Sequence, residues 1–326
     1  MKKFLCVILA ALMLFAFAAC GNNDEIPVPD VKTDVNVAAL KGPTGMGMVN
    51  LMTEDASAYN NYNFTLATAP TEIVGLITNK SVDIAACPLN LAATLYKKTQ
   101  GAIQIIAVNT LGTLYILENG ETITDIASLK GKTICASGQG ATPEYVLNYL
   151  LEKNGIDKDK DVEIVWKSEH SEVATLMASG EVDVCLLPEP NVTAVMLQNA
   201  DVRIALDMTK EWETVSEGEL AMGCLIATKE YIENNSDSLK AFLKEYNESV
   251  EAVNANTDEI CQLIADKGIV PKAPVAKKAI PNCNIVCITG SEMKTIAESN
   301  FNMLFNADPT SIGGELPNES IYYNAE

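Results

Sequence analysis

Two stretches of the chain, 100 residues apart, repeat one pattern without a gap. The first runs from Glu72 to Tyr96 and the second from Glu172 to Met196. The residues at five pairs of equivalent positions are identical: Glu72/Glu172, Leu76/Leu176, Val82/Val182, Asp83/Asp183 and Pro88/Pro188. Each copy predicts a helix, a turn, a short buried strand and a Pro-containing loop that opens another helix. A chain with two such copies is constrained to fold as two lobes of similar design.

Both copies extend upstream into an apolar strand, a Gly-rich turn and a helix. Val35–Leu40 precedes residues 41–52 in the first copy, and residues 132–136 precede residues 137–151 in the second. Apolar runs without alternation are typical of parallel strands that are covered on both faces. Strands that alternate with helices predict an α/β fold with one Rossmann-like lobe per copy. A cleft between two such lobes is a natural place for a small ligand.

The two Gly-rich turns are the first candidate ligand-binding pair. A helix N-terminus exposes unpaired N–H groups and partial positive charge, so it binds an anionic or electron-rich group without a cationic side chain. Thr142 fits an N-cap and Pro143 fits the first helical position. One such turn alone would be an ordinary strand-to-helix connection, but two in matched positions predict a facing pair. The candidates are Thr44, Gly45 and Met46 in lobe I and Gly138, Gln139, Gly140, Ala141 and Thr142 in lobe II.

The Pro-containing loops are the second candidate pair, namely Pro88-Leu89-Asn90 and Pro188-Glu189-Pro190. They follow strands at the carboxyl end, which is where ligands bind in open α/β sheets. Asn90 and Glu189 are candidates for side-chain hydrogen bonds to the ligand. A solvated loop carboxylate is the alternative for Glu189. If Glu189 lines the cleft, it favours a ligand with a donor or cationic group.

Other residues carry weaker signals. Arg203 is the only arginine and opens a strand remote from both loop pairs, so an arginine clamp on an anionic ligand has no support. The single histidine, His170, lies in a polar stretch and is expected to be exposed. Trp212 is expected near the mouth of the cleft. Packing in the core or on the surface is expected for three tyrosines: Tyr59, Tyr62 and Tyr145.

The amino terminus predicts export. Lys2 and Lys3 precede an apolar run from Phe4 to Phe17, and small residues follow up to Cys20. This pattern is a secretory signal, because the apolar run is too short to span a membrane. The following residues, 21–30, are polar and contain proline, which is typical of a tether.

Composition excludes some classes of partner. Asp and Glu number 43 against 23 Lys and Arg, which gives a net charge of −20, and no basic patch is visible, so nucleic acid is not an expected partner. Of nine cysteines, seven remain without Cys6 and Cys20, and an odd number cannot all pair. Buried free thiols are expected. The Cys283-x-x-x-Cys287 spacing without a nearby histidine fits no zinc pattern, so no metal or cofactor is expected.

The domain organisation follows from these elements. Residues 1–19 are expected to be the signal peptide, residues 20–30 are expected to be Cys20 and the tether, and residues 31–109 are expected to begin lobe I. Residues 110–212 form lobe II, and residues 213–326 return to lobe I with helices at the end. The two crossings are expected at 109–112 and 208–219, and residues 271–283 are expected to be a loop. The expected hinge residues are Asn109, Thr110, Asp207 and Met208.

The chain resembles the solute-binding proteins of ABC importers of the taurine, sulfonate and nitrate type, which are similar to binders of thiamine precursors. The resemblance covers nearly the whole chain and rests on residues 128–134, 137–144, 179–183 and 187–190. It implies a type II periplasmic-binding fold that closes on its ligand. Phe17–Cys20 resembles a lipoprotein lipobox, which implies cleavage before Cys20 and lipid attachment there.

The function that this resemblance implies is a lipid-anchored binding protein at the extracytoplasmic face of the cell membrane. It would capture a small anionic or polar organic solute as a monomer and deliver it to an ABC permease. Transport energy would come from an ATPase on other chains, because this sequence has no GxxxxGK[ST] phosphate loop. No catalytic residue is expected.

Two alternatives stay open. The first is an enzyme of the same fold, related to thiamine-pyrimidine or menaquinone biosynthesis enzymes. The thiamine-pyrimidine chemistry needs a His-rich and Cys-rich iron-binding segment, and one histidine provides no such segment and no Ser/His/Asp triad. The second is an adhesion or structural lipoprotein, which has no need of two Gly-rich helix entries. Ligand-induced closure would separate the binding protein from it, and turnover would separate the enzyme.

Overall fold

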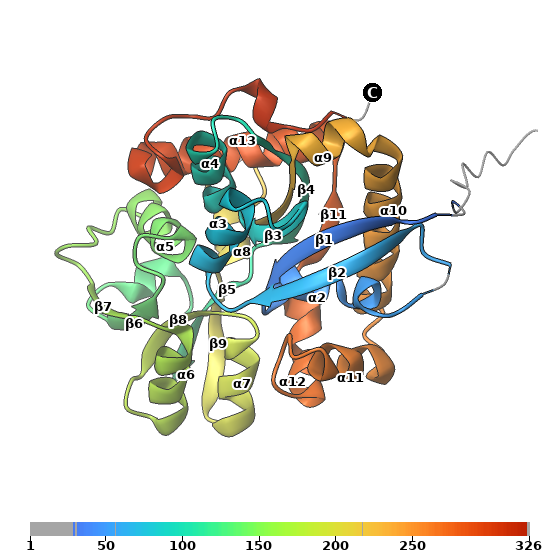
Figure 1. The fold of residues 1–326 in the computed structure, drawn as a ribbon. Helices are drawn as coiled ribbons and strands as arrows, with labels where there is room; N and C mark the ends of the chain where they lie inside the picture. The colour runs from blue at the N-terminus through green and yellow to red at the C-terminus, as the bar shows by residue number, and fades with distance from the viewer. Residues whose placement is uncertain (1–28, 30, 56, 217, 325–326) are drawn as a thin grey trace, which may run out of the picture.

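The chain folds into two α/β lobes, each built on its own sheet (Figure 1). A computed structural model describes residues 29, 31–55, 57–216 and 218–324. The signal peptide, Cys20 and nearly all of the tether lie outside these residues. We call the six-stranded sheet and its helices lobe I, and the five-stranded sheet and its helices lobe II. The α/β fold expected from the duplicated pattern is therefore confirmed.

The spatial order of the strands in each sheet differs from their order in the sequence. From one edge to the other, lobe I contains β11 (Ile285–Ile288), β4 (Ile103–Leu111), β10 (Ala221–Thr228), β3 (Ile84–Pro88), β1 (Thr33–Leu40) and β2 (Asn60–Ala67). Lobe II contains β7 (Glu163–Lys167), β6 (Thr133–Ser137), β8 (Val184–Pro188), β5 (Leu114–Asn119) and β9 (Val202–Asp207).

Helices cover both sheets. Those of lobe I are α2 (Pro43–Met46), α3 (Pro70–Thr78), α4 (Leu89–Lys98), α9 (Lys229–Asn234), α10 (Ser236–Asn254), α11 (Asp258–Asp266), α12 (Ala273–Ala279) and α13 (Gly290–Ala307). Those of lobe II are α5 (Thr142–Lys153), α6 (His170–Ser179), α7 (Asn191–Gln198) and α8 (Met208–Glu213). Short 3-10 turns are η1 (Val49–Met52), η2 (Ile126–Leu129), η3 (Ile280–Asn282), η4 (Pro309–Ile312) and η5 (Glu319–Ile321).

The duplicated pattern becomes α3–β3–α4 in lobe I and α6–β8–α7 in lobe II. In lobe I, β1 pairs in parallel with β2 and β3, and in lobe II, β6 pairs in parallel with β7 and β8. The carboxyl ends of parallel strands lie at one edge of a sheet, so the loops after them come together there. Each repeat therefore places its Pro-containing loop at the same edge as its Gly-rich turn.

The sheets are mixed, because β10 runs antiparallel between β3 and β4 and β5 runs antiparallel to β8 and β9. Only Gly112 and Thr113 separate β4 in lobe I from β5 in lobe II. The second crossing leaves β9, passes through α8 and enters β10.

Three elements differ from the prediction. The second crossing contains the helix α8 where an irregular segment was expected, because the Asp207 side chain caps it by accepting the Thr209 N–H. Residues 271–283 form α12 and η3 instead of a loop, because Pro274 stands in the first turn, where proline is tolerated. The helix expected in residues 41–52 is divided into the four-residue α2 and the 3-10 turn η1.

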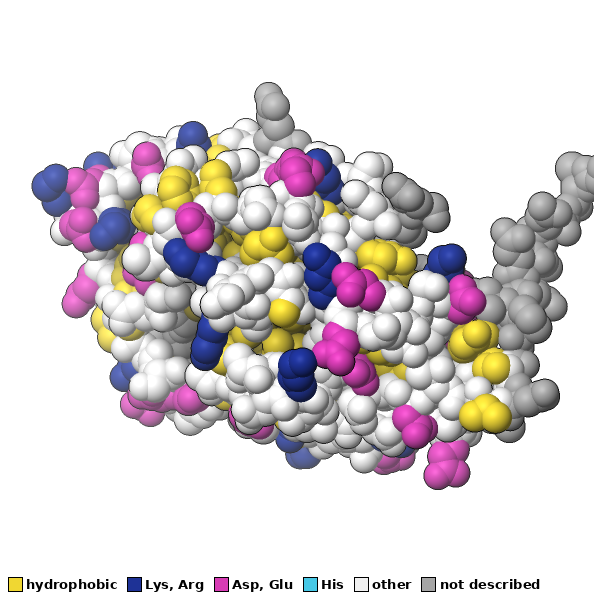
Figure 2. Space-filling view, turned by 45° about the horizontal axis from the view of Figure 1, so that its top comes forward, with side chains coloured by type: hydrophobic (Ala, Val, Ile, Leu, Met, Phe, Trp, Pro, Cys, Tyr) yellow, Lys and Arg dark blue, Asp and Glu magenta, His cyan; other side chains and the backbone are white. Residues whose placement is uncertain are grey.

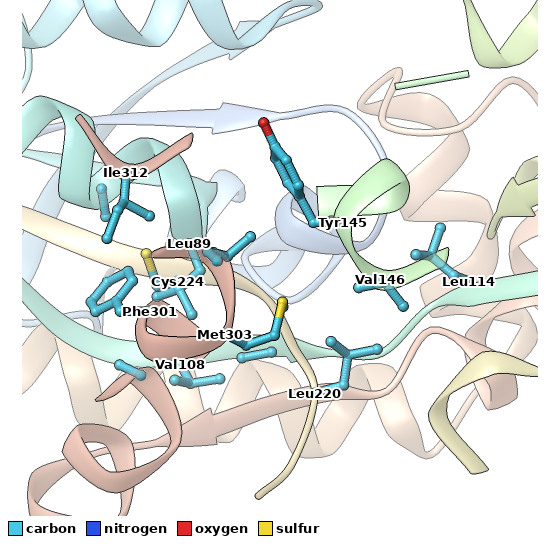
Figure 3. Close-up of a cluster of buried hydrophobic side chains, with 14 of the residues drawn as sticks. Leu89, Val108, Leu114, Tyr145, Val146, Leu220, Cys224, Phe301, Met303 and Ile312 are labelled. Atoms are coloured by element: carbon cyan, nitrogen blue, oxygen red, sulfur yellow. The ribbon is translucent and has the colours of Figure 1, made fainter. Parts of the chain in front are cut away.

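One cluster of buried hydrophobic side chains extends through both lobes (Figure 3). Leu89 and Val108 come from lobe I, whereas Leu114 and Val146 come from lobe II. Met303 of α13 also belongs to this cluster, and α13 packs against α5. The lobes are therefore joined by apolar packing as well as by their two crossings.

None of the helices in the described part of the chain is both long and apolar enough to cross a membrane. Seven cysteines fall in that part, and all seven are free thiols. Six are buried, and Cys287 is partly buried. Burial raises the pKa of most of these thiols. The pKa of Cys287, for example, rises to about 11. The prediction of buried free thiols is confirmed for these residues, and Cys283 and Cys287 are not bonded to each other.

Candidate ligand-binding site between the lobes

The turn after β6 is shaped by two glycines with positive φ. Gly138 has φ 85°, and a Cβ there would lie 2.9 Å from Cγ of Pro143. Gly140 has φ 75° and open space around it. L-residues rarely adopt this conformation, so the turn itself requires both glycines. The structure places Ala141 at the N-cap and Thr142 at the first helical position, one residue from the prediction.

This turn carries its own carboxylate. The Gly140 N–H donates to Oε2 of Glu144 at 2.6 Å, so a negative charge already lies at the N-terminus of α5. The same arrangement occurs in lobe I, where the Thr68 and Ala69 N–H groups donate to Glu72 at the start of α3. Helix N-termini that are capped by acidic side chains are weaker anion sites than bare ones.

The turn after β1 is mainly structural. The Gly45 and Met46 N–H groups both donate to the Gly42 carbonyl at 3.0 Å. The Met46 side chain is fully buried in the core of lobe I, so it is not placed to contact a ligand. A Cβ on Gly45 would lie 2.4 Å from the Leu40 carbonyl oxygen, which explains the glycine. Among the predicted residues of this turn, Thr44 alone keeps a partly exposed side chain, and its hydroxyl donates to the Leu40 carbonyl at 3.3 Å.

Predicted residues of the two lobes touch at the edge of the sheets. The Thr142 hydroxyl of α5 donates to Oδ1 of Asn90 in α4 at 3.5 Å. Asn90 also donates to the Ser311 carbonyl at 3.5 Å. Leu89, which was predicted beside it, is 1 % exposed and belongs to the hydrophobic core. Asn90 and Thr142 therefore lie at a boundary between the lobes, whereas Leu89 serves packing.

Glu189 forms a second contact between the lobes. It is 1 % exposed, and its carboxylate accepts both the N–H and the hydroxyl of Thr193 at 3.0 Å. Its Oε1 also accepts the Asn282 side-chain amide of lobe I at 3.3 Å. Burial raises the pKa of Glu189, and these hydrogen bonds oppose the shift. The solvated alternative for Glu189 is therefore wrong.

Neighbouring groups complete this second contact. The Tyr115 hydroxyl of β5 donates to the Asn282 carbonyl at 3.0 Å, so Asn282 bonds lobe II through two groups. A Cβ on Gly42 would lie 3.8 Å from Cδ of Pro190. We call Asn90, Thr142, Glu189 and Asn282 the interlobe residues. Asn282 was not predicted from the sequence, because its segment was expected to be a loop and no repeat partner marks it.

The expected hinge residues lie beside this edge. Asn109 and Thr110 are buried in β4, and the Asn109 amide donates to the Thr44 carbonyl at 3.4 Å. Gly223 of β10 packs closely on them, since a Cβ there would lie 2.7 Å from both Asn109 Oδ1 and Thr44 Cγ2. Met208 is fully buried at the start of α8. The structure thus connects the first crossing directly to the turn after β1.

His170 was expected to be exposed, and that prediction is wrong. It is partly buried, and its Nδ1 lies 2.6 Å from Oγ of Ser137, which is itself 1 % exposed. Burial lowers the pKa of His170, and the charge of Glu169 opposes the shift. The pair does not form a catalytic triad, because no carboxylate among the described residues hydrogen-bonds the imidazole and Ser137 is inaccessible. The two residues are 33 positions apart, and no sequence motif joins them.

Several other candidates lie away from the interlobe residues. Trp212 is 1 % exposed and packs against Tyr149, with 4.9 Å between ring centroids and 38° between the ring planes, so the prediction that it faces the cleft mouth is wrong. The Arg203 guanidinium binds Glu118 at 2.6 Å, which confirms its separation from the loop pairs. The Tyr145 hydroxyl donates to Asp308, beside a surface groove that Gln139 and Gly140 line together with α5 and the C-terminal end of α13.

Comparisons with known proteins place the chain in a family. A family model described as NMT1/THI5 like matches residues 68–260, which is more than half of the chain. A curated protein of Bacillus subtilis (strain 168), named "Putative binding protein YtlA", is 24% identical over 264 residues that cover 78% of this chain and 75% of that protein.

Two solved structures share the fold. An ABC transporter protein from Parabacteroides distasonis has a TM-score of 0.77 and 20% identity, and the match covers 90% of this chain and 100% of that chain. The periplasmic aliphatic sulphonate binding protein SsuA from Escherichia coli has a TM-score of 0.69 and 16% identity, with 85% and 88% covered. The fold is therefore the two-lobed α/β fold of periplasmic binding proteins, and the chain belongs to the NMT1/THI5-like family.

Proposed function

We propose that the protein is the solute-binding lipoprotein of an ABC importer and that it holds its solute between the lobes. The observation that carries the proposal is a pair of polar contacts between the two lobes. There, Thr142 meets Asn90, and Glu189 meets Asn282. Polar groups that face each other across a boundary can both reach a small molecule placed between them. The family and the fold of the neighbours support the same conclusion.

The charges favour a polar solute that donates hydrogen bonds over a strong anion. The only arginine, Arg203, binds Glu118 away from the interlobe residues. Glu144 caps the turn before α5, and the buried carboxylate of Glu189 lies at the contact itself. A sulfonate or nitrate would need to approach these carboxylates without a guanidinium partner, whereas amino, amide or hydroxyl groups would find acceptors.

The proposed cycle uses the two crossings as hinges. Residues 31–109 and 213–326 would form one rigid half and residues 110–212 the other, with bending at Asn109, Thr110, Asp207 and Met208. Contact between Asn90 and Thr142 corresponds to a closed arrangement of the lobes. Solute bound between the lobes would favour this arrangement, and the closed form would dock on the permease. An ATPase on separate chains would drive transport.

The proposed location is the extracytoplasmic face of the membrane, with a lipid on Cys20 as the anchor. The charge pattern suits a monomer in solvent, because lysine and acidic side chains are interspersed over the face in Figure 2. We expect Cys20→Ser to release the protein into the aqueous fraction of a detergent phase separation, while the wild type follows the detergent. Equal partitioning of both forms would contradict the anchor.

Thermal unfolding of residues 21–326 against a panel of solutes tests the binding function. The panel holds aminopyrimidines, amino acids and riboflavin as donors, and taurine, ethanesulfonate and nitrate as anions. A donor compound at a hundredfold excess over its Kd should raise the Tm by about 5 °C or more, since only the native state binds it. No shift with any compound, in protein shown by mass spectrometry to carry no bound molecule, would contradict the function.

Two variants test whether the compound binds between the lobes. Thr142→Val removes the hydroxyl that meets Asn90 and keeps the side-chain shape, and we expect the Kd to rise about fivefold or more, from the loss of one hydrogen bond. Glu189→Gln should weaken binding of a donor compound similarly. Thr175→Val on α6 is the matched control, because its hydroxyl bonds only within its own helix. Unchanged affinity in both variants would remove the interlobe site.

A further inference from the structure

The first crossing changes its hydrogen-bond partner from one lobe to the other within a single residue. The Gly112 carbonyl accepts the Asn284 side-chain amide of lobe I at 2.5 Å. Asn284 holds this end of β4 a second time, because its own carbonyl accepts the Leu111 N–H at 3.0 Å. The next carbonyl along the chain, that of Thr113, accepts the Glu189 N–H of lobe II at 3.0 Å. Thr113 therefore stands between a peptide unit that is held by lobe I and one that is held by lobe II.

The second crossing shows the same change in the opposite direction. The Trp212 indole N–H of α8 donates to the Gly218 carbonyl at 2.6 Å, which ties that peptide unit to lobe II. The Asn300 side chain of α13 donates to the Glu219 carbonyl at 2.8 Å and accepts the Ala221 N–H at 3.2 Å. These two bonds tie the following units to lobe I. Glu219 therefore stands between a peptide unit of each lobe, as Thr113 does.

These two residues lie on neighbouring stretches of chain. Leu111 at the end of β4 pairs with Ala221 at the start of the antiparallel β10. Thr113 follows this pair by two residues and Glu219 precedes it by two, so both lie just beyond the same end of the two strands. Neither residue belongs to a helix or a strand. A line through Thr113 and Glu219 can therefore serve as one axis of rotation between the lobes.

A glycine next to each of these residues packs across the boundary between the lobes without a hydrogen bond. A Cβ on Gly112 would lie 2.0 Å from Oγ1 of Thr209 in lobe II, yet this hydroxyl oxygen is buried and has no hydrogen-bond partner among the described residues. A Cβ on Gly218 would lie 2.6 Å from Oγ of Ser299 in α13 of lobe I. Rotation of the lobes therefore slides packed atoms past each other at these two contacts and breaks no hydrogen bond there.

We propose that Thr113 and Glu219 are the two pivots about which the lobes rotate. Each residue has only two soft backbone dihedrals, φ and ψ, and in both residues these dihedrals lie between peptide units that are held by different lobes. Hinges concentrate a large change of φ and ψ in a few residues of loops or at the ends of elements. The rigid halves are then residues 31–112 with 220–326 on one side and residues 114–218 on the other.

Closure of the lobes is part of the proposed function, so this inference rests on it and refines it. The four residues at which the proposed cycle bends become parts of the rigid halves. Asn109 and Thr110 move with lobe I, because they are buried in β4. Asp207 and Met208 move with lobe II, because the Asp207 side chain caps α8 and Met208 is buried at its start.

Small-angle X-ray scattering of the unliganded protein tests the pivots without any solute. Glu219→Gly replaces an exposed side chain and widens the range of φ and ψ at one pivot, so we expect a larger radius of gyration. Thr113→Gly should have the same effect at the other pivot. Glu121→Gly, at an exposed glutamate in the turn after β5, is the matched control and should scatter like the wild type.

A further variant separates these pivots from the neighbouring strand. Thr110→Gly within β4 should lower the stability, because Thr110 is buried, and should leave the radius of gyration unchanged. The proposal is wrong if Thr110→Gly enlarges the protein as much as Glu219→Gly does. It is also wrong if either pivot variant scatters like the wild type.

The solute panel distinguishes failure of the pivots from failure of the proposed function. If a compound binds, Glu219→Gly should raise its Kd about two- to fivefold, because open arrangements compete better with the closed one, and Glu121→Gly should leave the Kd unchanged. If no compound binds but both pivot variants enlarge the protein, the pivots stand and the proposed function fails. If a compound binds wild type and Glu219→Gly equally well and neither pivot variant changes the scattering, the pivots are wrong and the proposed function stands.

Discussion

Glu118 in β5 is an acidic residue that folding removes almost entirely from solvent, with a side chain 4 % exposed. It accepts the N–H groups of Thr122 and Ile123, the Thr122 hydroxyl and the Arg203 guanidinium. Burial alone would raise its pKa, but these donors and the arginine charge outweigh burial and lower it. Through these hydrogen bonds, the Glu118 carboxylate holds the turn after β5 against β9.

We expect Arg203→Met to destabilise the protein by about 1–3 kcal/mol, because Glu118 keeps its other donors but loses its cation. Urea unfolding at pH 7 measures this loss. In the wild type, the lowered pKa of Glu118 contributes stability above its ordinary value of 4.5, and this contribution is lost as the pH falls towards the folded value. Lys80→Met, which breaks an exposed pair with Glu230, is the control and should change stability by less than about 1 kcal/mol.

The environments of some residues could be predicted from the sequence, and those of others could not. The place of Arg203 at the start of a strand correctly predicted its separation from the loop pairs. For Glu189 the sequence left two alternatives open, and its burial excludes the solvated one. Trp212 and His170 were misplaced, because their environments come from Tyr149 and Ser137, which are distant in sequence. Polar neighbours along the chain indicate exposure only when no other element covers the residue.

Among the elements, the crossing from β4 to β5 packs closely against α8. A Cβ on Gly112 would lie 2.0 Å from Oγ1 and 3.0 Å from Cβ of Thr209 in α8. The Gly112 carbonyl also accepts the Asn284 side-chain amide at 2.5 Å. The two crossings therefore contact each other, so a bend at one crossing would displace the other.

We expect Gly112→Ala to cost about 1–3 kcal/mol through overpacking against Thr209. Thr209→Ala in the same chain removes the closest atom and should restore part of the stability. A double-mutant cycle by urea unfolding measures the coupling, and additive effects would contradict the clash. Gly75→Ala, where a Cβ meets nothing within 4 Å, is the matched control.

Long apolar strands were the elements best predicted from the sequence. The strand expected at Val35–Leu40 became β1, and the one expected at residues 132–136 became β6 with its bounds shifted by one residue. The short elements α8 and α12 were missed, because their stability comes from a cap and from packing rather than from a periodic pattern. The Gly-rich turn after β1 was overinterpreted, since backbone packing explains its glycine at position 45.

In the whole molecule, a few polar contacts hold the two lobes together on one side. Asn282 bonds lobe II through its amide to Glu189 and through its carbonyl to Tyr115. On the same side, α12 packs against α7 (Figure 1). The opposite side, at α5 and α13, is held by the shared hydrophobic cluster. We therefore expect the lobes to separate first on the Asn282 side.

We expect Asn282→Ala to shift the unliganded protein towards more open lobes, seen as a larger radius of gyration by small-angle X-ray scattering. It should also weaken solute binding, because less of the binding-competent state is populated. Asn247→Ala on the outer face of α10 is the control, since its amide bonds only Glu251 of its own helix. An unchanged radius of gyration in Asn282→Ala would show that this contact does not hold the lobes.

The hydrophobic cluster that passes through both lobes has a thermodynamic consequence. Side chains such as Leu89 and Val146 lose their packing partners if either lobe unfolds alone, so each lobe's folding depends on that of the other. The molecule should then melt as one cooperative unit, with equal calorimetric and van't Hoff enthalpies. If the proposed solute binds at the boundary, it should protect lobe I and lobe II equally, and amide exchange in either sheet should report its occupancy.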